Sequence, residues 1–234
     1  MPGESNRGVC DFIFVIDATG SMGPCMEALK ANIGVFIETL TTGQSPIRDW
    51  RGKVVAYRDI KVDGKKWFED RPFVRNDPAK LKAQLAELHP EGGGDEPESL
   101  LDALFVVAGM EADAAGAQNP ADNKWRFRRD AARVVIVFTD ATYHAKMSVP
   151  GAEGGGVRDV ANQIMAQKII LIVYAPDHDC YDELSQIDRS EWEAIPGPNY
   201  VEGLANYTSD TANFQKALVA LAKSVSKSAE VPLL

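Results

Sequence analysis

The stretch CDFIFVIDATGSM, residues 10–22, decides the fold class of this chain. Residues 10–16 are rich in aromatic and β-branched side chains without regular polar alternation, so they predict a strand that is buried on both faces. Asp17, Thr19 and Ser21 follow this strand directly. From Met22 to Leu40, apolar residues recur at intervals of three and four, which predicts an amphipathic helix. A buried strand, a polar turn and a helix in this order are typical of a crossover unit in a parallel sheet.

The same alternation of short apolar runs and helical segments continues along the chain. Further strands are predicted at residues 52–57, 65–69, 132–139, 168–174 and 199–202. Helices are predicted at residues 100–110, at the stripe Leu81, Leu85 and Leu88 after the capping pair Asp77 and Pro78, and at the stripe Phe214, Leu218, Leu221 and Val225. This order predicts an α/β fold with a mostly parallel central sheet of about six strands. No internal repeat or linker is visible, so residues 1–234 are expected to form a single domain.

The composition and charge argue against several classes of protein. Of 234 residues, 25 are basic and 34 acidic, so the formal net charge is −9, and neither nucleic acid nor an anionic membrane is expected as a partner. The three cysteines, Cys10, Cys25 and Cys180, show neither a disulfide framework nor a zinc-finger spacing. No signal peptide or membrane-spanning run is visible, so a cytoplasmic protein is expected. The basic run at residues 124–133 is interpreted as a solvated surface, or alternatively as a docking patch for an acidic partner.

Oxygen-bearing side chains gather where the predicted strands end. Asp17, Thr19 and Ser21 occupy alternate positions after the first strand, and Asp140 follows the strand predicted at 132–139. Because parallel strands end at one edge of the sheet, these side chains are expected to face one crevice, where a cation would relieve the repulsion between carboxylates. Hard divalent cations such as Mg²⁺ prefer oxygen ligands. The alternative is that Thr19 or Ser21 merely caps a helix.

Together these residues resemble the metal-ion-dependent adhesion site of the von Willebrand factor A domain, a Rossmann-like module of integrins and many bacterial proteins. The first motif of that family, Asp-x-Ser-x-Ser, is matched by Asp17, Thr19 and Ser21, with one Ser-to-Thr change. Its last metal aspartate matches Asp140. A glycine-rich loop leads into Asp-Glu-Pro-Glu at residues 95–98, which is similar to the middle loop of the integrin β-subunit version and nominates Glu98. The resemblance covers nearly the whole chain and implies a doubly wound sheet with helices on both faces.

The resemblance also implies a second cation beside the first. In integrin β-subunits it is held by a loop aspartate, a proline carbonyl, a glutamate and an aspartate after the second strand. Asp95, Pro97, Glu98 and Asp59 match these four positions, whereas Gly93 stands where the family has an asparagine. The alternative is that Asp59 pairs with Arg58 or with another basic residue.

The resemblance implies that the protein is a binding module and not an enzyme. Mg²⁺, or Mn²⁺ or Ca²⁺ in its place, would capture an Asp or Glu of a partner protein, and such domains serve as scaffolds in bacterial multi-protein systems. The charges of Asp17, Asp140 and Glu98 sum to −3, which exceeds the +2 of the ion. Direct binding by all three would therefore over-neutralise the ion. We expect Asp140, Glu98 or both to bind through water, which leaves a position open for a partner.

Two other functions remain open. One is a metal-dependent hydrolase or phosphatase on the same scaffold, for which His144, four residues after Asp140, is the sole candidate base that stands out. The other is a structural domain with an empty site, since Glu98 stands where most members of the family place a threonine.

Overall fold

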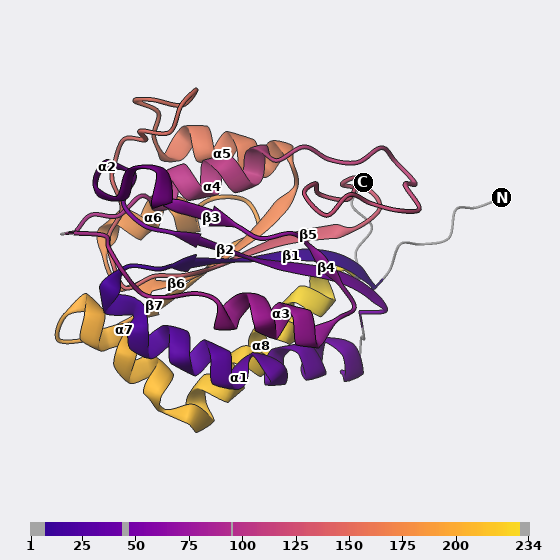
Figure 1. The fold of residues 1–234 in the computed structure, drawn as a ribbon, viewed down its shortest axis with the longest axis horizontal. Helices are drawn as coiled ribbons and strands as arrows, with labels where there is room; N and C mark the ends of the chain where they lie inside the picture. Colours follow the sequence, from indigo (N-terminus) through magenta and orange to yellow (C-terminus); the bar gives the residue numbers. More distant parts are fainter. Residues whose placement is uncertain (1–7, 44–46, 95, 230–234) are drawn as a thin grey trace.

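A mostly parallel sheet runs through the centre of the protein (Figure 1). The structure is a computed structural model that describes residues 8–43, 47–94 and 96–229. The seven strands follow the order β3-β2-β1-β5-β6-β7, and β4 also pairs with β2; only β3 and β4 run antiparallel to their neighbour. The strands are β1 (Val9–Asp17), β2 (Asp49–Tyr57), β3 (Phe68–Asp70), β4 (Val74–Arg75), β5 (Ala132–Phe138), β6 (Ile169–Pro176) and β7 (Ser190–Ile195). The predicted α/β fold is confirmed.

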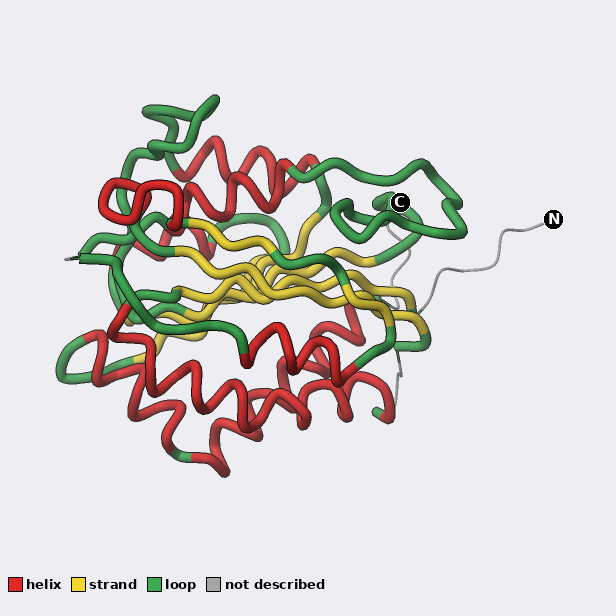
Figure 2. The backbone as a smooth tube through the Cα atoms, in the orientation of Figure 1, coloured by secondary structure: helices red, strands yellow, loops and turns green. Residues whose placement is uncertain are grey.

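Helices cover both faces of this sheet (Figure 2). One layer contains α1 (Gly23–Thr42), α3 (Pro78–Ala86), α7 (Tyr200–Ser209) and α8 (Thr211–Ser228). The other contains α4 (Leu100–Gly109) and α5 (Val157–Ala166), with the short α2 (Ile60–Asp63) and α6 (Asp182–Ser185) beside them. Single 3₁₀ turns are η1 (Gly20–Met22), η2 (Gly64–Lys66) and η3 (Asp179–Tyr181). In the described ranges, no helix is both long and apolar enough to cross a membrane.

Strand β1 contributes side chains to the cores on both faces of the sheet. Phe12, Phe14 and Ile16 pack against the layer of α1 and α8. Ile13 and Val15 pack against the layer of α4 and α5. All five side chains are fully buried. This two-sided burial is why residues 10–16 lack the polar alternation of a strand with one solvated face, and it confirms the central position predicted for them.

Two of the predicted strands require correction. Residues 199–202 begin helix α7, because the side chain of Asn199 accepts a hydrogen bond from the backbone N of Glu202 and so caps the helix. The last parallel strand is instead β7, an edge strand whose polar, partly exposed residues hide the usual apolar signal. The strand predicted at 65–69 starts later, at Phe68, because Gly64 adopts a positive φ and opens turn η2.

The basic run at residues 124–133 is a solvated surface only in part: Arg128 and Arg129 are exposed, whereas two other arginines turn into the protein. Arg126 and Arg133 are buried, 6% and 1% exposed. Arg126 and Arg51 converge on the fully buried Asp11 of β1: Arg51 donates to both carboxylate oxygens, at 3.0 and 2.6 Å, and the backbone N of Arg126 donates at 2.8 Å. Arg51 also donates to the carbonyls of Ala121 and Lys124. A buried ion pair therefore ties the irregular segment before β5 to the sheet.

Replacement of Asp11 by alanine is expected to destabilise the protein strongly. Arg51 would remain buried without its carboxylate and Arg126 would keep only Asp49 in the described chain, and breaking a buried ion pair from one side costs about 3–5 kcal/mol. Chemical denaturation measures this change in the free energy of unfolding.

The matched control is Asp188→Ala, because Asp188 is 80% exposed and lies 3.9 Å from its arginine partner. This control is expected to change stability by no more than about 0.5 kcal/mol. A similar small effect for both variants would contradict the structural role assigned to Asp11.

Candidate metal site

Strand register brings the candidate residues to one edge of the sheet. Asp17 at the end of β1 is level with Tyr57 on β2, and Ile16 is level with Phe138 on β5. Strands β1, β2 and β5 therefore end next to one another. Asp59 and Asp140 each lie two residues after the end of their strand. Ligands of open parallel sheets bind at this carboxyl edge.

Hydrogen bonds link the first motif to Asp140. Thr19 donates to Asp17 Oδ1 from its backbone N at 3.0 Å and from its hydroxyl at 2.7 Å. Ser21 Oγ lies 3.3 Å from Thr19 Oγ1 and donates to Asp140 Oδ1 at 3.0 Å. Neither η1 nor α1 receives a side-chain capping bond at its N-terminus. The helix-cap alternative for Thr19 and Ser21 is therefore wrong, and four predicted site residues form one connected cluster.

Glu98 reaches this cluster from a different segment. Its backbone N donates to Thr142 O at 2.9 Å, and its carbonyl accepts from the backbone N of His144 at 3.0 Å. A Cβ placed on Gly93, whose φ is +92°, would lie 2.7 Å from both Glu98 Oε1 and Thr19 Cβ. These two atoms are therefore at most twice that distance apart. Because residue 93 is glycine, the Glu98 carboxylate can approach Thr19 over bare backbone.

The three carboxylates are buried and oppose one another electrostatically. Asp17 is 0%, Asp140 2% and Glu98 4% exposed. Burial, and next the neighbouring Asp17, raise the pKa of Asp140 to about 7. Burial, followed by Asp17 and Asp59, raises the pKa of Glu98 to about 9. Burial also raises the pKa of Asp17, against hydrogen bonds from Thr19 and Thr139 that lower it. Taken as protein groups alone, this site therefore resists full ionisation.

Arg58, a buried arginine beside the site, directs its side chain elsewhere. It donates to the carbonyls of Glu91, Lys66 and His89 and pairs with Glu69 at 2.7 Å. It lowers the pKa of Asp17 only as the last of several causes. Among the described residues, Asp17 and Asp140 therefore receive hydroxyl and backbone donors and no salt bridge.

Thr139 is a site residue that sequence reasoning missed. Its hydroxyl donates to Asp17 Oδ2 at 2.8 Å, on the opposite oxygen from Thr19. The two threonines therefore fix both oxygens of this carboxylate. The signal was present, since Thr139 directly precedes Asp140 at the end of a predicted strand.

The donor set can be tested against the requirements of a divalent cation. Within residues 8–43, 47–94 and 96–229, no three His, Cys, Asp or Glu side chains stand close enough to hold a metal by themselves. The hydroxyls of Thr19 and Ser21 would have to complete the shell, and oxygen is the donor that Mg²⁺ prefers. Glu98 Oε2 is buried without a hydrogen-bond partner in the described chain. Asp17, Thr19, Ser21 and Asp140 form one hydrogen-bonded cluster of oxygen groups. Glu98, with this unpaired Oε2, lies near Thr19, so the residues present fit a hard cation.

The structure gives less support to the predicted second cation site. Asp59 Oδ1 accepts from Lys61 N at 2.9 Å and Ser99 Oγ at 3.1 Å, and it lies 3.2 Å from His144 Nε2. The alternative pairing with Arg58 is not observed, whereas pairing with another basic residue, His144, is. Asp95 lies outside the described residues. A second cation at Asp59, Asp95, Pro97 and Glu98 stays a prediction.

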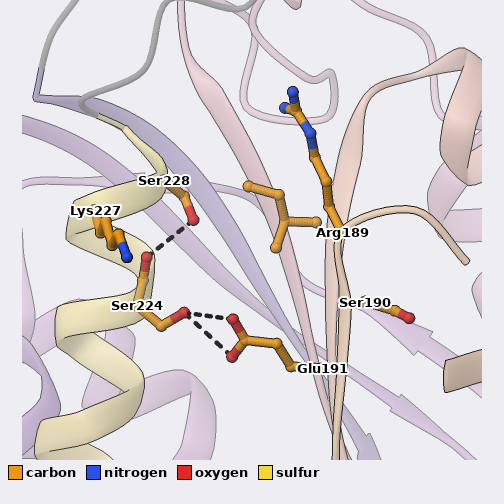
Figure 3. A pocket seen from close by; sticks show the side chains of 7 residues that line it. Arg189, Ser190, Glu191, Ser224, Lys227 and Ser228 are labelled. Carbon is orange, nitrogen blue, oxygen red and sulfur yellow. Dashed lines mark hydrogen bonds between the residues drawn. The ribbon is translucent and has the colours of Figure 1, made fainter. Parts of the chain in front are cut away.

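A cavity at the opposite end of the sheet is separate from this site (Figure 3). It lies between α8 and the starts of β6 and β7, and it is lined by Ile170, Arg189, Ser190, Glu191, Ser224, Lys227 and Ser228. Glu191 points toward Ser224 and accepts its hydroxyl hydrogen bond at 3.0 Å. None of the residues nominated from the sequence lines this cavity.

A family model of the von Willebrand factor A domain matches residues 11–114. The matched segment includes Asp17, Thr19, Ser21 and Glu98 and ends before Asp140. Alpha-protein kinase vwkA of Dictyostelium discoideum is 27% identical over 167 residues, which are 68% of this chain and 24% of the relative. von Willebrand factor A domain-containing protein 7 of Homo sapiens is 34% identical over 94 residues, 40% of this chain and 10% of the relative. The chain thus spans a quarter or less of these relatives.

Solved structures align with more of the chain. The pilus adhesin SpaC from Lactobacillus rhamnosus GG, in its open conformation, aligns with a TM-score of 0.50 and 13% identity over 90% of this chain and 30% of its own. A von Willebrand factor type A protein from Catenulispora acidiphila aligns with a TM-score of 0.48 and 18% identity over 87% of this chain and 42% of its own. At these identities the likeness to SpaC concerns the fold.

The raised pKa values predict how stability depends on pH in a chelator. Asp140 and Glu98 bind protons in the folded protein up to about pH 7 and 9, whereas an unfolded carboxylate releases its proton near about pH 4. Because the folded state binds more protons between these limits, the free energy of unfolding falls as pH rises from about 5 to 8. Thermal melts in EDTA across this range measure the fall.

Asp140→Asn is expected to flatten part of this decline, since it removes one of the coupled carboxylates. Asp182→Asn, at an exposed position, is the matched control and keeps the wild-type profile. Wild-type stability that is constant or rises between these pH values would show that the buried carboxylates do not repel one another as described.

Proposed function

We propose that this chain is a metal-dependent protein-binding domain. A divalent cation, Mg²⁺ or in its place Mn²⁺ or Ca²⁺, is held by Asp17, Thr19, Ser21 and Asp140 with the assistance of Glu98. The bound ion accepts an Asp or Glu side chain from another protein. The observation that carries the proposal is the buried, unpaired Glu98 Oε2 beside two further buried carboxylates that have hydroxyl but no cationic partners.

Charge balance gives the site its capacity to bind a partner. Asp17, Asp140 and Glu98 together carry −3 when ionised, which exceeds the +2 of the ion. An ion bound directly by all three would be a poor acceptor for another carboxylate. Ser21, which donates to Asp140, and Gly93, which leaves room beside Glu98, allow these two carboxylates to contribute without all binding the ion directly. The position left open then belongs to the partner, and a partner that favours this arrangement stabilises it by its difference in affinity.

The hydrolase alternative has less support. A hydrolase needs a base or a metal-activated water beside a substrate pocket. Both ring nitrogens of His144 already have contacts, Nε2 with Asp59 at 3.2 Å and Nδ1 with Lys61 Nζ at 3.1 Å. The match to the kinase among the relatives covers only 24% of that protein, so it gives no support for kinase activity in this chain. Binding is therefore the function that the site supports best.

The wider setting extends the proposal. Residues 1–234 act as one domain, in the cytoplasm of a bacterium, as a scaffold within a multi-protein system. Neither nucleic acid nor a membrane is a partner in this proposal, in agreement with the net charge of −9.

Metal binding is expected to raise the melting temperature. A ligand that binds only the folded state stabilises it by about 2.7 kcal/mol at a concentration one hundred times its Kd. Mg²⁺ and Mn²⁺ should therefore raise the melting temperature of the wild type. Asp17→Asn, which keeps the shape of the side chain, should lose most of this increase.

The control variant is again Asp182→Asn, which is expected to keep the full metal response. Wild-type melting that does not respond to millimolar Mg²⁺ or Mn²⁺ would favour the empty structural domain.

Capture of a partner is expected to depend on the same ion. Proteins retained from a lysate by the immobilised wild type in Mg²⁺ should be released by EDTA and should not be retained by Asp17→Asn. Replacing one acidic residue of the purified partner by its amide should abolish retention. A partner that stays bound in EDTA, or that binds Asp17→Asn equally well, would contradict capture through the metal.

A further inference from the structure

Next to the candidate metal site, helix α2 and His144 form a small surface that combines an ammonium group with an apolar tip. We call Lys61, Val62 and His144 the α2 rim. We propose that the α2 rim selects the partner: it binds an acidic peptide segment in which an apolar residue and a second acidic residue stand within a few positions of the metal-bound Asp or Glu. This inference rests on the proposed function and adds the sequence class of its ligand.

Val62 provides the apolar contact. It is 59% exposed, and the other large hydrophobic side chains that are exposed in the described chain, Met165 and Val201, belong to α5 and α7. A single exposed valine is common on protein surfaces, so what matters is where Val62 lies. A Cβ on Gly94 would lie 3.2 Å from Val62 Cγ2, and one on Gly93 would lie 2.5 Å from Thr19 Cγ2. Since consecutive Cα atoms are about 3.8 Å apart, Val62 lies within roughly 13 Å of Thr19.

The glycines between Thr19 and Val62 carry no side chains of their own, and neighbouring side chains pack against them: Asp63 at Gly92, Thr19 and Glu98 at Gly93, and Val62 at Gly94. Gly92, Gly93 and Gly94 all have positive φ, between 71° and 92°, where side chains are strained. Gly92 and Gly94 are exposed whereas Gly93 is buried, so a partner segment that runs from the metal to α2 meets the side chains of Thr19 and Glu98 at Gly93 and that of Val62 at Gly94. An extended segment advances about 3.3 Å per residue, so the distance corresponds to at most four residues.

Lys61 provides the cationic contact, and His144 fixes its position. Lys61 Nζ lies 3.1 Å from His144 Nδ1, and His144 Nε2 lies 3.2 Å from Asp59 Oδ1. Because an ammonium has only donors, Nδ1 accepts from Lys61 and Nε2 donates to Asp59. His144 is itself anchored through its backbone N to the carbonyl of Glu98. Within the described part of the chain, Lys61 Nζ contacts only His144, so two of its three N–H donors remain for a ligand.

Local charge favours an acidic segment at this rim. Residues 58–66 contain four basic and two acidic residues, within a chain whose net charge is −9. Arg58 is buried and paired with Glu69, whereas Lys61, Lys65 and Lys66 are exposed. Asp63, the acidic residue nearest to Val62 in sequence, accepts a hydrogen bond from Gly93 N. The exposed lysines thus give an acidic partner a second attachment beside the metal.

A library of short synthetic peptides with a fixed central Asp and random flanks tests this inference. The peptide library is incubated with the wild-type protein in Mg²⁺ and in EDTA, and with the variants Val62→Ser and Lys61→Gln. The controls are Val201→Ser and Lys223→Gln, the same substitutions at exposed positions on the opposite helical layer. Peptides selected in Mg²⁺ are expected to carry an apolar residue and a second acidic residue near the central Asp.

For a selected peptide, Val62→Ser is expected to raise the Kd on the order of tenfold, because apolar contacts are lost. Lys61→Gln should raise the Kd and weaken its dependence on salt, whereas both controls should bind as the wild type does. Magnesium-dependent binding without either flanking preference, or equal affinities for rim and control variants, would overturn the α2 rim and leave the proposed function standing. Absence of any magnesium-dependent peptide would overturn the proposed function as well.

Discussion

Repulsion among buried carboxylates is the physical constraint on which the interpretation of this protein depends. Asp17, Asp140 and Glu98 are withdrawn from water at one edge of the sheet. Burial raises the pKa of all three, and Asp17 further raises the pKa of Asp140 and of Glu98. The neighbouring side chains are hydroxyls, which orient a carboxylate but do not neutralise it. Such an arrangement is costly unless a positive charge completes it, and a divalent cation is the simplest group that would do so.

The two ends of strand β1 show how differently the same fold treats a buried aspartate. Asp11 and Asp17 are both fully buried. Asp11 meets two arginines, receives good hydrogen bonds on both oxygens, and serves to attach the segment before β5. Asp17 accepts hydrogen bonds from Thr19 and Thr139, and Ser21, which contacts Thr19, donates to a second aspartate, Asp140. The first end is paired with cationic side chains, whereas the second has only hydroxyl and backbone donors among the described residues, and this difference is the reason the metal site is proposed at the carboxyl ends of the strands.

Sequence patterns were most informative where the signal is local. The two-sided burial of residues 10–16 and the run into Asp140 predicted the central strands and the cluster of Asp17, Thr19, Ser21 and Asp140. Strand β7 was missed because an edge strand needs little apolar character, and Asn199 was misread because capping depends on one side-chain contact. Arg126 contacts Asp11, more than one hundred residues earlier, and Lys61 contacts His144, 83 residues later. Neither leaves a trace in local composition.

A crystal structure of the protein grown with Mn²⁺ tests the central claim most directly, because anomalous scattering locates this ion independently of the protein coordinates. The account predicts one strong anomalous peak among Asp17, Thr19, Ser21 and Asp140, on the side that faces Glu98. A map in which that position holds no anomalous density while Mn²⁺ is bound elsewhere would contradict it, and the buried carboxylates would then require another explanation.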